Sequence, residues 1–365
     1  MRANTHPQTP DLFPVLVRNS QASLDPLALN LQVGLMVTSA VSTAVKLGLA
    51  THIGEQPKTI DELANGTQTH APSLYLLMRA LAGIGIFEEI DEDTHMFGNT
   101  ERSLLLLPDV AGSLVQLWGA EYQWDSWRDL VHTIQTGKPA ISKRYGDDAN
   151  IWTYLNDHPD ENKQFQQGLA VNASLIIPTL LETYDFSGFQ QIVDVGGGHG
   201  ALSISLLRHY PQLRVTLFDR ANIIELVQQG SARTLPADIL ARYSLVAGSF
   251  FETVPGGDCY IIKNVLMDWS DADYLRILHT CRNAMRGSSG RLLILEPVLS
   301  AETPFTKFFT LQMAMMMHAA KHRTLADHQA LLATAGFTLT QAIPLGLEQM
   351  LLEAQVSTTK EEVEE

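Results

Sequence analysis

The stretch over residues 191–219 constrains the fold of this chain more than any other part of the sequence. An apolar run over 192–195 breaks into four closely spaced glycines between residues 196 and 200, and a helical pattern and a second apolar run then follow. Glycine allows the positive φ of a tight turn and lets a ligand approach the backbone closely. The stretch therefore predicts a strand, a glycine turn, a helix and a parallel strand, which form the βαβ unit of a doubly wound sheet.

The residues around the turn indicate which ligand it binds. Their spacing, G-G-G-x-G after an acidic residue, differs from the G-x-G-x-x-G pattern that seats a pyrophosphate on a helix N-terminus. Asp194 would repel a diphosphate and suits a cationic or amino-bearing ligand instead. Asp219 follows the glycines by about 20 residues, where a carboxylate can hydrogen-bond a ribose hydroxyl pair. A nucleoside with a positive charge and no phosphate is S-adenosylmethionine.

Composition narrows the class of protein. A length of 365 residues predicts two domains, and a net charge of −15 argues against non-specific binding to nucleic acid. No stretch has the apolar length of a membrane span, and residues 1–20 lack the regions of a signal peptide. The two cysteines, Cys259 and Cys281, are typical of a reducing compartment. We expect a cytoplasmic protein without a metal site.

The N-terminal part predicts a dimerisation domain over residues 26–111, preceded by a flexible arm over 1–25. A nearly apolar helix over 27–49 is expected to be buried on most sides, with a second subunit as its partner. Two shorter helices and a two-stranded wing over 88–100 then make a winged-helix-like module. Such a module binds DNA or serves as a scaffold. The scaffold is favoured, because Arg79 is the only basic residue of the would-be recognition helix and the wing is acidic.

Residues 112–185 predict a helical connector that contributes to a substrate pocket. Aromatic residues at helical spacing pack in a core more often than they line a pocket, but clefts favour the boundary between two domains. The aromatic residues of this connector are Trp118, Tyr122, Trp124, Trp127, Trp152, Tyr154 and Phe165.

Residues 186–356 predict the S-adenosylmethionine-binding domain. After the opening unit, strands are expected over 243–249, 259–265, 291–297, 337–345 and 348–356. Two helices are expected between these strands, one that Ser270 caps and one that Thr324 caps. The last two strands are joined only by Gly346 and Leu347, which predicts an antiparallel hairpin. The expected fold is α/β, a class I methyltransferase Rossmann-like sheet of seven strands with the last one antiparallel, and the tail over 357–365 is expected to be disordered.

Several motifs together resemble one family. They are D-V-G-G-G-H-G at 194–200, the acid at Asp219, and the segments 248–271, 294–298 and 321–337. The chain resembles the small-molecule O-methyltransferases of plant caffeate and bacterial antibiotic pathways over about residues 25–356. The resemblance implies a homodimer, an N-terminal dimerisation domain that helps to close the active site, and S-adenosylmethionine as cofactor. Candidate cofactor-binding residues are Asp194, Gly196, Gly198, Asp219, Ser249, Phe250 and Lys263, with Phe250 beside the adenine.

Two departures from the family pattern stand out. Ser249 replaces an aspartate that holds the adenine amino group, so cofactor affinity should fall without vanishing. Met267 replaces the histidine that serves as general base, although Asp268 and Glu296, which orient that histidine in the family, are retained. A thioether cannot accept a proton near neutral pH, and general-base catalysis contributes roughly 10²–10⁴-fold. His322 stands where the family has a further glutamate.

The missing base leaves three alternatives. His322 or His318 takes over the role, or the acceptor attacks without a base because it is an amine, a ring nitrogen, an activated carbon or an ionised hydroxyl. In the third alternative the cofactor is bound but the reaction is pericyclic, hydroxylating or decarboxylating, as in some relatives of this family. A winged-helix regulator is a remote fourth reading.

The expected reaction is methyl transfer to oxygen, nitrogen or carbon of a small aromatic or polyketide-like secondary metabolite. The expected helix over 303–318 is rich in phenylalanine and methionine, and methionine adapts to flat rings. Candidate acceptor-binding residues are Phe165, Asn172, Met313, Met316, Met317 and His318. Candidate catalytic residues are Met267, Asp268, Glu296 and His322.

Overall fold

The computed structural model of the chain describes residues 26–285 and 290–357. The expected arm over 1–25 and residues 358–365 of the expected tail lie outside the described residues. The chain divides into two compact units, Met1–Glu121 with Lys163–Val171, and Tyr122–Asn162 with Asn172–Glu365. None of the helices within the described ranges is long and apolar enough to cross a membrane.

The first unit confirms the helix–helix–wing module. Its elements are α2 (Pro26–Lys46), α3 (Leu49–Ile53), β1 (Lys58–Thr59), α4 (Ile60–Thr67), α5 (Ala71–Gly83), β2 (Phe87–Asp91), β3 (Met96–Asn99), α6 (Glu101–Leu104), a π-helix (Pro108–Gly112) and α7 (Ser113–Trp118). The wing strands β2 and β3 pair antiparallel, and the two-residue β1 adds a third strand beside β3. The hydroxyl of Thr59 caps α4 in a capping box with Glu62.

The expected burial of the first long helix is found within the described chain only in its C-terminal part, where Ser42, Ala44 and Val45 are buried. Leu35 and Met36 of α2 are 66% and 67% exposed. Large apolar side chains at this exposure need cover from outside the single chain, because leaving them in water forgoes roughly 1.5–3 kcal/mol each. The second subunit expected from the sequence would supply that cover.

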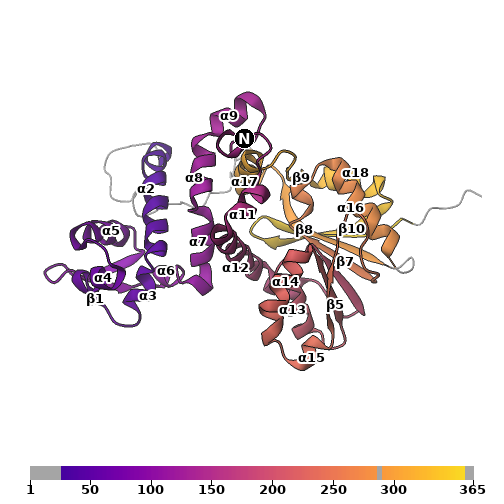
Figure 1. Cartoon of the computed structure of the whole chain (residues 1–365), viewed down its shortest axis with the longest axis horizontal. Helices are drawn as coiled ribbons and strands as arrows, with labels where there is room; N and C mark the ends of the chain where they lie inside the picture. The colour runs from indigo at the N-terminus through magenta and orange to yellow at the C-terminus, as the bar shows by residue number, and fades with distance from the viewer. Residues whose placement is uncertain (1–25, 286–289, 358–365) are drawn as a thin grey trace, which may run out of the picture. The chain divides into compact units, whose positions relative to one another are not determined.

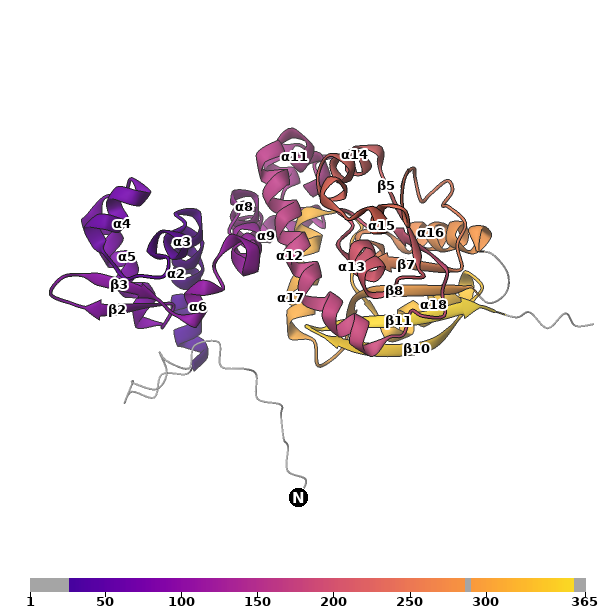
Figure 2. The same cartoon turned by 90° about the horizontal axis from the view of Figure 1, so that it is seen from below.

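The second unit holds a mixed sheet in the order β10-β11-β8-β7-β4-β5-β6. Its strands are β4 (Gln191–Val195), β5 (Arg214–Asp219), β6 (Tyr243–Ala247), β7 (Cys259–Lys263), β8 (Arg291–Leu299), β10 (Phe337–Gly346) and β11 (Gln349–Val356). Strand β11 is antiparallel to both of its neighbours and the remaining pairs are parallel, which confirms the expected fold. Figure 2 shows β7, β8, β11 and β10 side by side in this order. A two-residue strand, β9 (Arg323–Thr324), pairs with the end of β8 and was not expected.

Helices cover both faces of this sheet (Figure 1). The second half of α12 (Pro159–Thr183), α13 (Ala201–His209), α14 (Ala221–Gln229) and α15 (Ala237–Leu240) pack on one face, in a core that includes Ile192 and Leu217. α16 (Asp271–Ala284) and α18 (Leu325–Thr334) pack on the other face, in a core that includes Val193 and Ile262. Alternate residues of β4 therefore enter different cores, as expected for a strand buried on both faces.

The strand order places the site at the carboxyl ends of the central strands. The chain passes from β4 to β5 on one side and later returns to β7 on the other side of β4. Ligands of doubly wound sheets bind outside the carboxyl ends of the strands at such a switch point. The turns after β4, β5, β6 and β7 are thus the ones that can build a cofactor site.

Five further helices lie in the second unit or at its boundary. They are α8 (Glu121–Arg128), α9 (Leu130–Thr136), α10 (Ser142–Tyr145), α11 (Ile151–Asp157) and α17 (Pro304–Met316). The side-chain amide of Gln312 on α17 donates to the buried Gln123 on α8, 2.5 Å away. The backbone N–H of Ile141 donates to Met315 O. These bonds attach α17 to the helices that precede α12.

The hairpin between β10 and β11 turns one residue later than expected. β10 continues through Gly346, and the turn is made by Leu347 and Glu348, whose φ angles are 49° and 58°. The Glu348 carboxylate accepts hydrogen bonds from the backbone N–H groups of Phe305 (3.2 Å) and Thr306 (2.6 Å) in the first turn of α17. A side chain on the hairpin therefore caps a helix that begins more than 40 residues earlier.

Leu347→Gly and Glu348→Gly form a matched pair that tests this cap. Both changes relieve a positive φ, but only Glu348→Gly removes the carboxylate from α17. We expect Glu348→Gly to unfold with a free energy about 1 kcal/mol below that of Leu347→Gly, the usual contribution of a helix cap. Urea titration of both variants measures the difference, and equal stability would contradict the capping role.

Candidate active site

The glycine turn after β4 packs its backbone tightly against protein on several sides. Gly196 has a φ of +69°, and a Cβ added there would come within 2.7 Å of Val265 Cγ2 in the segment after β7. At Gly197 an added Cβ would come within 2.6 Å of Asp194 Cγ. Gly198 differs, because its φ is +57° and an added Cβ would meet no described atom within 4 Å. Open space therefore lies beside Gly198.

Two carboxylates border this turn. Asp219, at the end of β5, accepts hydrogen bonds from Gly198 N (2.9 Å) and Arg220 N (2.7 Å) and stays half-buried. Each oxygen keeps a lone pair for a further donor such as a ribose hydroxyl. Asp194 is fully buried in β4, where Ser203 Oγ of α13 donates to it at 2.6 Å. Burial raises the pKa of Asp194 to about 6 against the lowering effects of Ser203 and Lys263.

The turns after β6 and β7 supply the other expected cofactor residues. Ser249 Oγ accepts a bond from Phe251 N at 3.3 Å, and the half-buried ring of Phe250 meets the edge of Trp269 at 5.8 Å between centroids. Burial lowers the pKa of Lys263 against the raising effect of Asp194.

Asn264 is a further candidate that sequence reasoning missed. It adopts a φ of +53°, and its buried Oδ1 has no hydrogen-bond partner among the described residues. No motif would have marked this asparagine, since its signal is a backbone conformation.

These groups fit S-adenosylmethionine. Open space lies beside Gly198, the carboxylate of Asp219 faces that turn, and the ring of Phe250 lies after the neighbouring strand. Carboxylates and an unpartnered amide oxygen suit hydroxyl and ammonium donors, whereas a diphosphate would meet repulsion there. The space and the polar groups around the glycine turn thus match the hydroxyl and ammonium groups of this cofactor.

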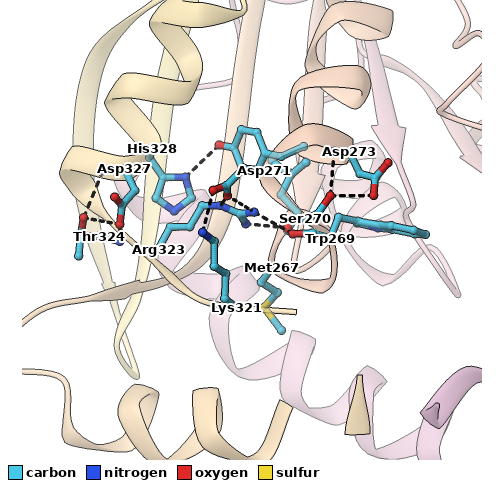
Figure 3. A network of polar contacts seen from close by, with 12 residues as sticks. Met267, Trp269, Ser270, Asp271, Asp273, Lys321, Arg323, Thr324, Asp327 and His328 are labelled. Atoms are coloured by element: carbon cyan, nitrogen blue, oxygen red, sulfur yellow. Dashed lines mark hydrogen bonds and ion pairs between the residues drawn. The ribbon is translucent and has the colours of Figure 1, made fainter. Parts of the chain in front are cut away.

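The segment that carries Met267 is fixed by a buried arginine of β9. Arg323 is 1% exposed and donates to Leu266 O (2.9 Å), Trp269 O (2.8 Å) and Asp271 Oδ1 (2.9 Å). Figure 3 shows Lys321 and Arg323 converging on Asp271, while the side chain of Met267 points away from these groups. A guanidinium satisfies several buried carbonyls at once because its donors are held in one plane. Residues 266–269 are thereby held in one conformation.

Met267 lies in an apolar cluster instead of a polar one. It packs with Met313 of α17 and Ala320, and the half-buried Phe309 and Met317 pack against this group. No described residue of the cluster can take up a proton, so its surface is suited to an apolar ring.

Asp268 belongs to the same segment, and Glu296 of β8 contacts the backbone of that segment. Glu296 is 1% exposed and accepts a hydrogen bond from Met267 N at 3.1 Å. Burial raises its pKa to about 7, although Arg323 and the Met267 N–H oppose this. Asp268 is half-buried by surface area, but the protein around its carboxyl desolvates it, and with the charge of Glu296 this raises its pKa to about 8. The pair cannot readily ionise together.

His322 is buried with a defined tautomer. Its Nδ1 lies 2.9 Å from Thr310 Oγ1, and the Thr310 hydroxyl donates its own proton to Thr306 O at 2.7 Å. Thr310 can therefore only accept from His322, which places the ring proton on Nδ1 and leaves a lone pair on Nε2. This Nε2 is buried and has no partner among the described groups. Burial, with Arg323, lowers the pKa of His322 to about 4, so the ring is neutral at physiological pH.

The remaining candidates lie on α12, on α17 and just beyond α17. Met313 and Met317 share the cluster with Met267, whereas Met316 is buried outside it. His318 is exposed just beyond α17, and Phe165 and Asn172 are half-buried on α12. Arg323, Tyr274 and His328 were not expected at this site, because each reaches it from another element.

Two family models match the chain. The model of an O-methyltransferase domain matches residues 127–338, and that of an O-methyltransferase dimerisation domain matches residues 29–109.

Individual proteins are similar over most of their length. The phenazine O-methyltransferase of Lysobacter antibioticus is 34% identical over 348 residues, which cover 93% of this chain and 99% of that protein. The phenazine-1-carboxylate N-methyltransferase of Pseudomonas aeruginosa is 33% identical over 325 residues, or 86% and 92% of the two chains. The solved structure of an O-methyltransferase from neocarzinostatin biosynthesis, in complex with S-adenosylmethionine and 2-hydroxy-5-methyl naphthoic acid, is 30% identical, has a TM-score of 0.71, and covers 88% of this chain and 96% of that one.

Ser249→Asp tests the expected adenine contact. Aspartate at this position would accept a hydrogen bond from the adenine amino group as a charged acceptor, and such bonds contribute about 1.5–3 kcal/mol. We expect S-adenosylhomocysteine to bind roughly tenfold or more tightly in calorimetric titration, and Ser249→Ala to bind more weakly than the wild type. Unchanged affinity in Ser249→Asp, with an unchanged melting temperature, would remove residue 249 from the cofactor site.

Proposed function

The chain belongs to the O-methyltransferase family and is a transferase that uses S-adenosylmethionine, and we propose that its methyl acceptor is a small aromatic or polyketide-like secondary metabolite. The named relatives support this proposal, since two are phenazine methyltransferases and the third was solved with a naphthoic acid. They include O- and N-methyltransferases, so we propose oxygen or nitrogen as the attacked atom. The matches give no support to the non-methylating alternative or to a winged-helix regulator.

The apolar cluster around Met267 carries the proposal. The cluster follows Val265, which packs on Gly196 of the cofactor turn, by only two residues. Flat apolar rings gain dispersion contacts with methionine and phenylalanine walls, which would hold an acceptor against the turn. When bound, S-adenosylmethionine supplies an electrophilic methyl group on a positively charged sulfur. Catalysis by this chain would then rest chiefly on proximity and orientation.

We propose that His322 Nε2 takes the proton of a hydroxyl acceptor. Its lone pair is buried and unpartnered within the described structure, and Thr310 fixes the tautomer that exposes it. A pKa of about 4 makes it a weak base in the resting enzyme. A hydroxyl becomes far more acidic as its oxygen is methylated, so a weak base suffices late in the reaction.

The assembly and compartment are proposals as well. We propose a homodimer built on residues 26–111, a connector over 112–185 that adds to the acceptor pocket, and a catalytic domain over 186–356. The dimerisation model over 29–109 supports the first of these, and the buried bond between Gln312 and Gln123 supports the second. We further propose a cytoplasmic enzyme that does not act on nucleic acid, supported by two buried, unpaired cysteines and the net charge of −15.

Product and S-adenosylhomocysteine should form in equal amounts. We expect this ratio when the purified protein is incubated with S-adenosylmethionine and a panel of hydroxylated and nitrogen-containing aromatic acids, followed by mass spectrometry. An acceptor that is converted without S-adenosylhomocysteine would contradict methyl transfer and favour a non-methylating reaction.

Thr310→Val and Thr306→Val form a matched pair that tests His322. Both threonines lie on α17, but only Thr310 holds the imidazole, whereas Thr306 Oγ1 has no described partner. We expect His322→Gln to lower kcat with a hydroxyl acceptor roughly 10²-fold, Thr310→Val to lower it less, and Thr306→Val to leave it near the wild type. Cofactor affinity should stay constant throughout. Equal kcat in His322→Gln and wild type would exclude the histidine as proton acceptor.

A further inference from the structure

Three buried polar side chains, Tyr274, His328 and Glu296, form a connected series that ends at the backbone of Met267. The hydroxyl of Tyr274 on α16 lies 2.9 Å from His328 Nδ1 on α18. His328 Nε2 lies 3.5 Å from Glu296 Oε1 on β8. All three side chains are at most 1% exposed. Helices on one face of the sheet thus reach the carboxylate that holds the backbone of Met267.

The direction of the hydrogen bond in this chain follows from chemistry. Burial raises the pKa of the Tyr274 hydroxyl, so the phenol keeps its proton and can donate it to His328 Nδ1. The imidazole proton then sits on Nε2 and faces Glu296 Oε1. In the opposite tautomer a lone pair would face the carboxylate and repel it. At 3.5 Å this contact is an attraction between charge and dipole and not a full hydrogen bond.

The two neighbouring carboxyls receive unequal support. Glu296 is approached by the Met267 N–H and by His328 Nε2. Among the described residues none donates a hydrogen bond to the Asp268 carboxyl, which keeps part of its surface exposed. Hydrogen bonds stabilise the ionised form of a carboxyl, so the negative charge favours Glu296.

We propose that Tyr274 and His328 are positioning residues that hold the negative charge on Glu296. The proton that the two carboxyls share then stays on Asp268, whose O–H group binds a carbonyl or carboxylate oxygen of the methyl acceptor. This inference rests on the proposed function and narrows its substrate class to aromatic molecules that carry such an oxygen beside the atom to be methylated.

The charges around the pair agree with this distribution. Burial raises the pKa of both carboxyls, to about 8 for Asp268 and about 7 for Glu296, so the pair retains a proton near neutral pH. The contacts that Glu296 receives from Met267 N–H and His328 assign this proton to Asp268. Glu296 interacts with Arg323 on β9, Tyr274 on α16 and His328 on α18. Asp271 on α16 and His322 before β9 interact with Arg323. Both histidines have a pKa lowered to about 4, chiefly by burial, and so remain neutral. Arg323 is the permanent cation and lowers the pKa of Glu296.

The position of Asp268 suits contact with an acceptor. It follows Met267 directly, and Met267 forms part of the apolar cluster proposed to hold the ring. An acceptor seated there would meet an apolar wall and, one residue on, a partly exposed carboxyl. A neutral O–H can bind an acceptor's carboxylate, whereas an ionised Asp268 would repel it.

Isotope-edited infrared spectroscopy tests the proton directly and needs no turnover. The full-length protein is prepared with aspartate labelled in the side-chain carboxyl, and spectra are recorded from neutral to alkaline pH. We expect one protonated-carboxyl band at neutral pH that shifts with the label, disappears in Asp268→Asn, and titrates near the raised pKa. The absence of this band would overturn the proposal, whether or not the protein methylates anything.

Tyr274→Phe and His328→Phe test the positioning residues. Either change weakens the support for charge on Glu296, so the proton should move toward Glu296 and the labelled aspartate band should lose intensity at neutral pH. Tyr274→Phe removes only a hydroxyl, and it keeps the experiment decisive if His328→Phe fails to fold. A band unchanged in the folded variants would assign the two residues a merely structural role.

A kinetic comparison tests the acceptor class. With 2-hydroxy-1-naphthoate, KM should rise as the pH increases through the titration of Asp268, while 2-naphthol should show no such rise. In Asp268→Asn the amide donates at every pH, so the rise should be absent. A parallel pH dependence for both acceptors would overturn the inferred contact. Failure of both acceptors to yield S-adenosylhomocysteine, with the infrared band present, would instead count against the proposed function.

Discussion

The buried guanidinium of Arg323 fixes the segment on which the chemistry of this site depends. It satisfies the carbonyls of Leu266 and Trp269, pairs with Asp271 and lies 4.6 Å from the ring centre of Tyr274. Losing it would leave buried carbonyls without donors, a cost of about 1–3 kcal/mol for each. Because the turn over 266–269 is held this way, Met267 can face an apolar cluster while its own N–H faces Glu296. One cation thus fixes the segment that carries Met267 of the apolar cluster and Asp268 of the carboxyl pair.

The fixed segment is consistent with our proposal that the site works without a base at residue 267. The family resemblance places a histidine at residue 267, whereas the Met267 side chain packs among apolar groups and only its backbone N–H contacts Glu296. His322 is held by Thr310 and its buried Nε2 has no partner among the described groups, and Glu296 is held by the Met267 backbone and His328. In our proposal, proton handling is therefore divided between two places, the neutral imidazole of His322 beside α17 and the carboxyl pair of Asp268 and Glu296. The glycine turn proposed to bind the cofactor lies at the switch point of the sheet and includes neither the imidazole nor the carboxyl pair.

Local signals made much of the fold predictable from sequence. The glycine turn, the capping residues Ser270 and Thr324, and the apolar strands each encode their structure within a few residues. The candidate site was predictable only in part. Arg323 contacts Leu266 across 57 residues of chain and Tyr274 contacts His328 across 54, and no spacing rule reports such contacts. The position of the hairpin turn at Leu347 and Glu348 also involves a distant contact, because Glu348 accepts a hydrogen bond from the first turn of α17.

Met267→His measures most directly whether this site is a methyltransferase that lacks only its usual base. The introduced imidazole would stand beside Asp268 and Glu296, the residues that orient it in the family. With a phenolic acceptor we predict that kcat/KM rises by roughly 10²-fold or more near neutral pH, and that it stays unchanged with an acceptor whose attacking atom carries no proton. An unchanged or lower kcat/KM with the phenol, at undiminished affinity for S-adenosylmethionine, would contradict the account.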